Sequence, residues 1–400
     1  MSCRFVPSLS SMDLSISHSH LLPPKGVDSK ELEGSKVLCY RGSAPAPPTG
    51  HVNNNRVLYT IVPSAYTTRT STRKLPTEPE RVLDAPGLVN DYYLNLMDFS
   101  KTNVLAVGLA NSVYLWNGST GSVSELCSFE NDTITSVSFS ASGTHLAIGT
   151  DSSVVRLWDI EKQKQVRSLR GHAARVSAMS WNSHILSSGS RDSTILNSDV
   201  RVADHVISSF KYHQGEICGL TWSHDGSQLA SGSNDNHVAI WNLESERPQH
   251  TLTDHQAAVK ALAWAPFQRN LLATGGGTAD RTIKTWNTTT GTCLDSVDTG
   301  SQVTSLLWSS QTRELISGHG FGNFEINLWK YPSMVRSGQL PGHSSRILSM
   351  AISPDGETVV SAGADEAIQF WKAFEQTERK SAVAGVAHAQ RAAVRGMHIR

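Results

Sequence analysis

From about residue 90 onward, short apolar runs end repeatedly in a tryptophan followed by a polar residue. Six such endings are Tyr114–Asn117, Arg156–Asp159, Ile240–Asn242, Thr285–Asn287, Leu328–Lys330 and Phe370–Lys372. Ser198-Asp199-Val200 is a degenerate seventh copy, between Trp158 and Trp241. Subtracting successive positions (116, 158, 198, 241, 286, 329 and 371) gives intervals of 42, 40, 43, 45, 43 and 42 residues. Such a period predicts one repeated unit of short strands rather than independent domains.

Histidines upstream of the endings identify the kind of repeat. Gly171-His172 and Gly342-His343 are complete Gly-His pairs, and His213 and His255 keep the histidine alone. A period of about 40–45 residues with a Trp-Asp ending and an upstream Gly-His is typical of WD40 propellers. The predicted fold is therefore all-β, a seven-bladed propeller over residues 81–375 with four strands in each blade.

Aspartates recur in the turns before the tryptophan strands: Asp151, Asp192, Asp235, Asp280 and Asp365. With a histidine, a hydroxyl and the tryptophan, each could form a hydrogen-bond chain inside its blade. A set repeated in blade after blade indicates a buried polar network, because buried polar atoms require partners. Phosphate-cradling loops, nucleophile elbows and metal-ligand motifs are missing from the sequence. We therefore expect no enzyme, no cofactor and no metal.

A propeller ring must close, because an open sheet edge invites aggregation. The last repeat ends at Trp371, and the residues that follow offer no clear outer strand. Early repeats do contain one, such as Ser122–Leu126. The sequence therefore predicts that the segment around Lys74-Leu75-Pro76 supplies the outer strand of the seventh blade.

Composition restricts the partners and the compartment. Lysine plus arginine and aspartate plus glutamate both total 35, the net charge is zero and the pI is about 7.3, so binding of nucleic acid by bulk charge is excluded. No apolar run approaches the roughly 20 residues that cross a bilayer, and the start of the chain lacks a secretory signal. Five scattered cysteines fit a reducing compartment.

Residues 1–80 differ from the rest, since they hold nine of the 15 prolines and no tryptophan. We expect a largely disordered arm with short docking motifs over residues 1–80, and a flexible tail over residues 376–400.

Several stretches go beyond a generic propeller and resemble the Fizzy family of cell-division-cycle activators, closer to Fizzy proper than to the Fizzy-related branch. The matching stretches are Arg81–Pro86, Asn90–Leu96, Ala273–Arg281, Asp298–Val303, Ser317–Phe321 and Leu328–Pro332. The resemblance implies a non-catalytic activator and substrate receptor of the anaphase-promoting complex, a ubiquitin ligase. Its substrates would be proteins such as cyclins and securin that carry a KEN box (Lys-Glu-Asn) or a destruction box (Arg-x-x-Leu).

One end of the ring suits a Lys-Glu-Asn peptide. In an antiparallel blade, the loops between second and third strands and the loops between blades emerge at the same end. The polar residues placed there are Asp91, Asn234, Asn236, Thr278, Gln302 and Arg346. Arg346 could pair with the peptide glutamate, Asp91 with its lysine, and the amides with its asparagine.

The resemblance places the destruction-box groove between the first and last blades. Asp84 and Glu366 match the family's acidic pair for the degron arginine. A third carboxylate, usual three residues after Asp84, is Gly87 here, which should weaken the arginine contact. The sequence does not assign the pocket for the degron leucine.

The arm and the tail carry further expected docking motifs. Arg56-Val57-Leu58-Tyr59 resembles the family's segment for the mitotic-arrest-deficient checkpoint protein, where it could add an edge strand. Arg4, Phe5, Val6 and Pro7 match the core of the ligase-binding C box, but Cys3 and Leu9 replace its leading acid and closing arginine. The final Ile399-Arg400 matches the family's second ligase tether.

Two alternatives to a ligase activator stay open. One is a diverged paralogue that binds degrons without activating the ligase efficiently, and the other is a generic WD40 scaffold. The resemblance implies a location in nucleus and cytoplasm, with ligase subunits and mitotic checkpoint proteins as partners and neither nucleic acid nor membrane.

Overall fold

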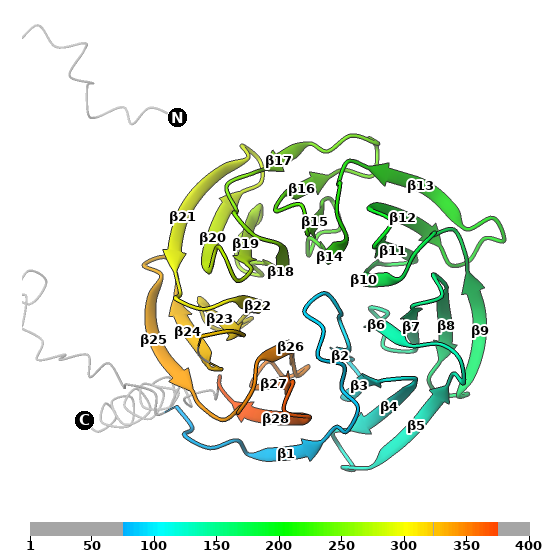
Figure 1. Cartoon of the computed structure of the whole chain (residues 1–400), viewed down its shortest axis with the longest axis horizontal. Helices are drawn as coiled ribbons and strands as arrows, with labels where there is room; N and C mark the ends of the chain where they lie inside the picture. Colours follow the sequence, from blue (N-terminus) through cyan, green and yellow to red (C-terminus); the bar gives the residue numbers. More distant parts are fainter. Residues whose placement is uncertain (1–74, 323, 375–400) are drawn as a thin grey trace, which may run out of the picture. The chain divides into compact units, whose positions relative to one another are not determined.

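The computed structural model describes residues 75–322 and 324–374, and these contain 28 strands. The strands form seven four-stranded sheets, all antiparallel, which follow one another around a ring (Figure 1). The prediction of an all-β, seven-bladed propeller is confirmed. The described strands run from Arg81 to Lys372. The expected tail and all of the expected arm except residues 75–80 lie outside the described residues.

The sequence order of the strands gives the blades. Blade 1 consists of β2 (Met97–Phe99), β3 (Val104–Leu109), β4 (Ser112–Asn117) and β5 (Val123–Ser128). Blade 2 consists of β6 (Ile134–Phe139), β7 (His145–Thr150), β8 (Val155–Asp159) and β9 (Lys164–Leu169). Blade 3 consists of β10 (Val176–Asn182), β11 (Ile185–Ser190), β12 (Thr194–Asp199) and β13 (Val206–Lys211).

The second half of the ring repeats this order. Blade 4 consists of β14 (Ile217–Trp222), β15 (Leu229–Ser233), β16 (Val238–Trp241) and β17 (His250–Leu252). Blade 5 consists of β18 (Val259–Trp264), β19 (Leu271–Gly276), β20 (Thr282–Asn287) and β21 (Thr292–Asp298). Blade 6 consists of β22 (Val303–Trp308), β23 (Glu314–His319), β24 (Ile326–Lys330) and β25 (Val335–Leu340). Blade 7 consists of β26 (Ile347–Ile352), β27 (Thr358–Gly363), β28 (Ala367–Lys372) and β1 (Arg81–Asp84).

Burial decreases from the second strand of a blade to its outer strand. The second strand of blade 5, β19, is buried at every position, whereas its outer strand β21 is almost entirely exposed. Middle strands are covered on both faces by neighbouring blades, so they read as continuous apolar runs rather than as alternating ones. The hydrophobic core lies between the blades, where Trp241, Trp286 and Trp371 are fully buried.

The ring closes through β1, which pairs antiparallel with β28 in the register Arg81↔Phe370 to Asp84↔Ala367. Closure by a segment that precedes the first blade is as expected, but the strand begins seven residues later than the predicted Lys74-Leu75-Pro76. Leu75 instead packs against the apolar cluster between blades 6 and 7. Pro76 has no backbone N–H to donate to a sheet, whereas the four residues of β1 all have one.

The repeated polar network exists in complete form in blades 4, 5 and 7. In blade 4, His213 lies 3.0 Å from the Asp235 carboxylate and 2.8 Å from the Ser231 hydroxyl, and Trp241 Nε1 donates to the same hydroxyl at 2.8 Å. Burial opposes ionisation of Asp235, but hydrogen bonds from His213 and from main-chain N–H groups hold its pKa below the ordinary value. Each set satisfies buried polar atoms inside one blade, as expected.

Blades 1 and 2 depart from the network. The indole N–H groups of Trp116 and Trp158 are buried without a hydrogen-bond partner among the described residues. The expectation for Asp151 is wrong, because its side chain is exposed and Asp132 fills the corresponding role. Asp132 accepts from the Ser152 N–H at 3.1 Å and from Arg156 at 3.3 Å. No histidine lies about 20 residues before Asp151, so the hydrogen bond that the aspartate forms in blades 3, 4, 5 and 7 is missing here.

Blade 3 contains the degenerate copy. Ser198 faces Leu186 across the strand pair, the position that Trp241 takes opposite Leu229 in blade 4. His172 keeps its bonds to Asp192 at 3.1 Å and Ser188 at 2.9 Å. The blade therefore retains the polar network without the tryptophan.

Candidate functional site

One segment, residues 88–96, enters the middle of the ring before β2 begins (Figure 1). Asn95 at its end donates from Nδ2 to the carbonyl oxygens of Ser177 at 2.7 Å and Cys218 at 3.0 Å, in blades 3 and 4. The same residue forms a parallel bridge with Ser136 of blade 2. A single asparagine thus joins the first blade to three others.

A buried lysine of blade 5 also holds residues 88–96 in place. Lys260 of β18 donates from Nζ to the carbonyl oxygens of Leu94 at 2.8 Å and Leu348 at 2.6 Å. Its Nζ lies 5.8 Å from the centroid of the Tyr92 ring. Burial lowers the pKa of Lys260 to about 8, partly offset by Cys218 and Asp91.

The two tyrosines of the segment reach further blades. The single proton of the buried Tyr92 hydroxyl faces two carbonyl oxygens, Ala258 at 3.2 Å and Val303 at 3.4 Å, at blades 5 and 6. The half-exposed Tyr93 hydroxyl donates to Asn234 Oδ1 at 2.9 Å. Residues 88–96 are therefore fixed at several points. Their polar side chains lie at one end of the central channel of the ring.

Asp91 belongs to an ionic cluster of three residues. Arg175 donates from Nη1 to the Asp91 carboxylate at 2.9 Å and from Nε to Glu216 at 2.7 Å. The hydrogen bonds that Arg175 donates to Glu216 raise the pKa of Arg175 above its ordinary value, against the effect of burial. The Asp91 side chain is 26% exposed, so one carboxylate still faces solvent for a cation.

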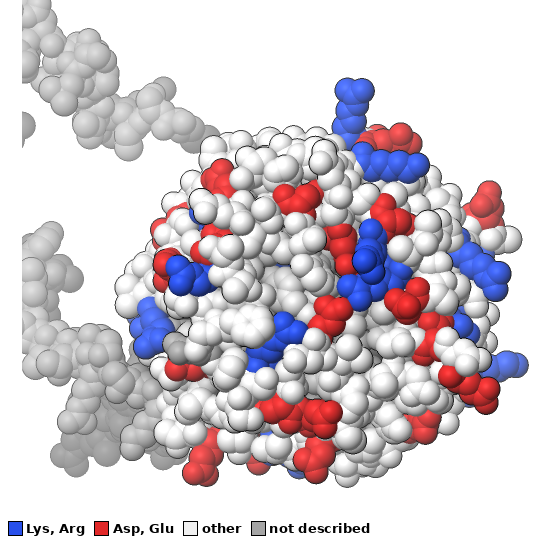
Figure 2. Space-filling model, viewed as in Figure 1, with Lys and Arg blue, Asp and Glu red and all other residues white. Residues whose placement is uncertain are grey.

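Arg346 lies on the other side of the segment. It donates from Nη2 to the Asn90 carbonyl oxygen at 2.6 Å, and its Nε also contacts the Asn90 side chain. Its guanidinium carbon lies 5.3 Å from the ring centroid of Phe321, which is 53% exposed. Basic and acidic side chains gather together near the middle of the face in Figure 2. The exposed phenylalanine next to a cation gives this surface an amphipathic character.

The remaining predicted residues of this face differ in exposure. Asn234 and Thr278 are exposed, and Asn236 is half-buried in a left-handed turn with a φ of 69°. Gln302 is 4% exposed, and its Oε1 has no hydrogen-bond partner among the described residues. The structure therefore brings Asp91, Asn234 and Arg346 together around one segment, and places Gln302 beneath the surface.

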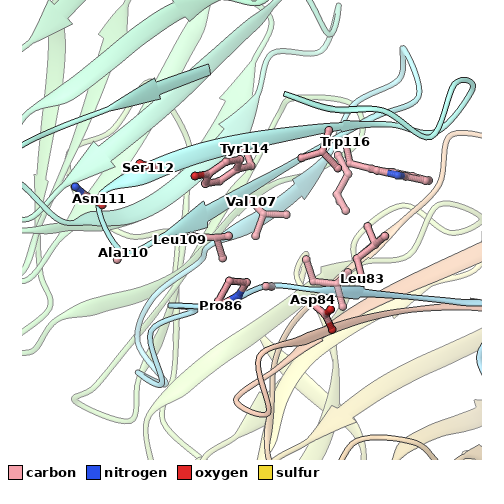
Figure 3. A pocket seen from close by; sticks show the side chains of 14 residues that line it. Leu83, Asp84, Pro86, Val107, Leu109, Ala110, Asn111, Ser112, Tyr114 and Trp116 are labelled. Carbon is pink, nitrogen blue, oxygen red and sulfur yellow. The ribbon is translucent and has the colours of Figure 1, made fainter. Parts of the chain in front are cut away.

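A groove of about 500 Å³ separates blade 1 from β1 of blade 7. Figure 3 shows Leu83, Asp84 and Pro86 along one side and Val107, Leu109 and Tyr114 along the other. The full lining is Leu83, Asp84, Ala85, Pro86, Leu105, Val107, Leu109, Ala110, Asn111, Ser112, Tyr114, Trp116, Val123 and Ile368. The groove is mostly apolar, and Asp84 is its acidic member.

Glu366 stands near the Asp84 end of this groove. It accepts the Gly87 N–H on Oε1 at 3.3 Å, and its carbonyl oxygen accepts the Ala85 N–H at 2.8 Å. Gly87 has a φ of 83°, a conformation that glycine adopts without cost. The two predicted acids are therefore joined to the groove by the same short turn.

Sequence reasoning missed three groups of residues. The apolar wall from Leu105 to Trp116 was not assigned because strand runs of this kind also form ordinary cores. The cluster partners Arg175 and Glu216, and the buried Lys260, carry no motif and are brought to the segment only by the ring. A charged residue inside an inner strand was the one available signal for Lys260.

Other expectations fall outside the described residues or concern absences. Arg4–Pro7, Arg56–Tyr59 and Ile399-Arg400 lie outside them, so the three docking motifs stay predictions. Within residues 75–322 and 324–374, no group of three or more His, Cys, Asp or Glu is arranged to hold a metal ion. The same residues contain no helix with the length and apolarity needed to cross a bilayer.

The fold and these surfaces define a WD40 propeller with a polar end face and an apolar groove between its first and last blades. Residues 83–371 match the family described as the CDC20/Fizzy WD40 domain, and the chain belongs to that family.

Relatives of both branches of the family are similar to the chain. The anaphase-promoting complex subunit cdc20 of Dictyostelium discoideum is 52% identical, over 88% of this chain and 72% of that protein. Cell division cycle 20.1, cofactor of APC complex, from Arabidopsis thaliana is 45% identical over 95% and 89%. Protein FIZZY-RELATED 3 of Arabidopsis thaliana is 49% identical over 78% and 65%. Relatives named for cdc20 and relatives named Fizzy-related thus match the chain at similar identity.

A solved structure agrees with these matches. A chain in the crystal structure of a mitotic checkpoint complex superposes with a TM-score of 0.75 and 44% identity, covering 85% of this chain and 99% of that one.

Proposed function

We propose that the protein is an activator and substrate-recognition subunit of the anaphase-promoting complex that captures short degrons and performs no catalysis itself. The observation that carries this proposal is the groove beside β1, where an apolar trough ends at Asp84 and Glu366. Family membership and relatives named as subunit or cofactor of that complex support the assignment.

The groove suits an Arg-x-x-Leu peptide. Asp84 is exposed at its end. Among the described residues, the Glu366 carboxylate accepts a single hydrogen bond, from the Gly87 N–H at 3.3 Å, so both side chains retain acceptor capacity for a guanidinium. The walls formed by Val107, Leu109 and Tyr114 would receive the leucine side chain, whose burial contributes roughly 1.5–3 kcal/mol.

The end face suits a Lys-Glu-Asn peptide. Asp91 would accept the peptide lysine, Arg346 would pair with the glutamate beside Phe321, and the amide of Asn234 would meet the asparagine. Thr278 and Asn236 would border the peptide. The unpartnered Gln302 oxygen offers a further acceptor, which a donor could reach if the neighbouring loop at Gly320 moved.

The docking partners follow from the branch of the family. We propose ligase subunits for Arg4–Pro7 and Ile399-Arg400, and a mitotic checkpoint protein for Arg56–Tyr59. A relative solved within a mitotic checkpoint complex supports the second partner class. Action in nucleus and cytoplasm, on substrates such as cyclins and securin, is part of this proposal.

Two labelled peptides test the proposal, one with Arg-x-x-Leu and one with Lys-Glu-Asn, titrated into the full chain and followed by fluorescence anisotropy. Asp84→Asn should weaken the first peptide and spare the second. Arg346→Gln should do the reverse. Failure of either peptide to bind the wild-type chain contradicts the corresponding site.

One observation favours a second candidate, a paralogue that binds degrons but activates the ligase poorly. Cys3 and Leu9 replace the acid and the arginine that flank the family's C box. Pull-down of ligase subunits by the wild-type chain and by Leu9→Arg distinguishes the two, because only the paralogue would bind no ligase until the arginine is restored.

A further inference from the structure

A cation without an acidic partner lies at the end of the groove opposite to Asp84. Arg81 begins β1, and its guanidinium carbon lies 5.4 Å from the ring centroid of Trp116. Arg81 is exposed, and within residues 75–322 and 324–374 no carboxylate lies within ion-pair distance of it. Its neighbour Glu80 pairs instead with Lys372 at 3.2 Å.

The position of Arg81 on β1 places its guanidinium on the groove side of the strand. Successive side chains on a strand point to opposite faces, so Arg81 shares the face of Leu83, which lines the groove. Asp84 lies three residues further on, about 10 Å away at roughly 3.3 Å per residue. The same alternation turns its side chain to the other face of β1, but at the end of the strand it still lines the groove. The groove therefore has a negative end at Asp84 and a positive end at Arg81, with apolar walls between them.

A second hollow of about 230 Å³ continues the groove beyond Trp116, which forms a wall of both. Arg81, Phe99 and Asn103 line it together with Asp355. Asp355 is already engaged, since it accepts the Glu357 N–H at 2.9 Å and contacts the Ser353 hydroxyl. The positive charge at this end that still lacks an acidic partner is therefore that of Arg81.

Within the described part of the chain, Trp116 lacks the indole hydrogen bond that its counterparts in blades 4 to 7 form. The indole N–H groups of Trp241, Trp286, Trp329 and Trp371 each donate to a serine or threonine on a neighbouring strand. Trp116 Nε1 is buried and has no such acceptor among the described residues. Its indole N–H is therefore a donor that could still form a hydrogen bond with an acceptor brought by a ligand.

We propose that Arg81 and Trp116 form an anion subsite for the degron, which binds a carboxylate or phosphate on a residue one to four places after the leucine. The inference rests on the proposed function, because the arginine of the same peptide must bind at Asp84 to direct the chain toward Arg81. A guanidinium stacked on an indole presents its donors in a fixed plane, which suits either anion. Acidic or phosphorylated destruction boxes would then be preferred substrates.

The test uses the full-length chain and a series of Arg-x-x-Leu peptides. Alanine, glutamate or phosphoserine occupies each of the four positions after the leucine in turn, and anisotropy measures affinity. One glutamate position should bind about three- to tenfold tighter than its alanine counterpart, and phosphoserine at least as much. Arg81→Gln should remove the gain and leave the alanine peptides unchanged, whereas Arg247→Gln, an exposed control in blade 4, should keep it.

The remaining outcomes decide whether the anion subsite, the proposed function or both are wrong. If the alanine peptides bind and depend on Asp84 but no acidic peptide gains affinity, the anion subsite is wrong and the proposed function stands. A gain that persists in Arg81→Gln also overturns it. A gain for phosphoserine alone assigns the subsite to phosphorylated degrons, and a gain for both assigns it to anions in general. If no Arg-x-x-Leu peptide binds, both proposals fail.

Discussion

Lys260 and Leu94 meet inside the ring, where the lysine Nζ donates to the leucine carbonyl oxygen at 2.8 Å. Leu94 lies three residues after Asp91, and Lys260 belongs to blade 5, so this bond ties the segment that carries Asp91 to a distant blade. The second bond of Lys260, to Leu348, adds blade 7 to the same tie. The end face therefore depends on a lysine that a bound peptide would not touch.

We predict that Lys260→Met weakens binding of the Lys-Glu-Asn peptide by roughly tenfold, or about 1.4 kcal/mol. The variant leaves the Leu94 and Leu348 carbonyls unpaired and releases the segment that presents Asp91. Binding of the Arg-x-x-Leu peptide should stay within twofold of wild type, because the groove lies outside the channel. Lys330→Met, at an exposed position of β24, serves as the matched control in the same anisotropy assay. Equal loss of both peptides would mean a general folding defect and no positioning role.

Lys260 also predicts a pH dependence. Its folded pKa of about 8 lies below the ordinary 10.5, so between these values the unfolded chain binds more protons than the folded one. Stability from this group therefore rises with pH across that window, by roughly 3 kcal/mol at most. The neutral amine keeps two N–H donors, so both carbonyl bonds survive its deprotonation.

Denaturant unfolding of wild type and Lys260→Met at pH 7.5, 9 and 10 measures this effect. The stability difference, wild type minus variant, should grow with pH. A difference that is flat or that shrinks would show that Lys260 titrates normally.

Ring closure predicts a stability effect for β1. Removing residues up to Asp84 deletes the strand that pairs with β28 and exposes the groove side of Ile368 and Phe370. A chain that begins at Ala85 should melt on the order of 10 °C below one that begins at Leu75, from several kcal/mol of lost packing and pairing. A chain that begins at Pro79 keeps β1 but loses the packing of Leu75, so it should melt between the other two and nearer to the Leu75 chain. Equal melting of all three chains would refute closure by β1.

Much of the fold was predictable from the sequence, because the tryptophan endings repeat at nearly constant intervals and each blade must bury the same faces. The closing strand was placed seven residues early, since an isolated four-residue strand such as Arg81–Asp84 has no periodicity of its own. Asp84, Glu366 and Arg346 could be proposed as site residues through the family's motifs. Arg175, Lys260 and Trp116 were not, because their roles arise only where segments distant in sequence meet.

Gly87 offers a gain of function. The position where the family carries a third carboxylate is open, since a Cβ there would meet only the Ala110 side chain at 3.8 Å. Gly87→Asp should tighten binding of the Arg-x-x-Leu peptide about three- to tenfold, through a third negative charge beside Asp84 and Glu366. The positive φ should cost about 1 kcal/mol of stability, seen as a slightly lower Tm. Gly87→Asn shares the shape and the strain but not the charge, so a similar gain with asparagine would refute the electrostatic explanation.

We propose above all that the groove at Asp84 and Glu366 binds the substrates that the chain brings to the ligase. The most direct measurement is ubiquitination of a destruction-box substrate by purified anaphase-promoting complex with added full-length chain. The wild-type chain should stimulate the reaction, and the double variant Asp84→Ala/Glu366→Ala should lose most of the stimulation for this substrate while it keeps stimulation of a substrate that carries only a KEN box. Stimulation that is unaffected by the double variant, or no stimulation by the wild-type chain, would contradict the account.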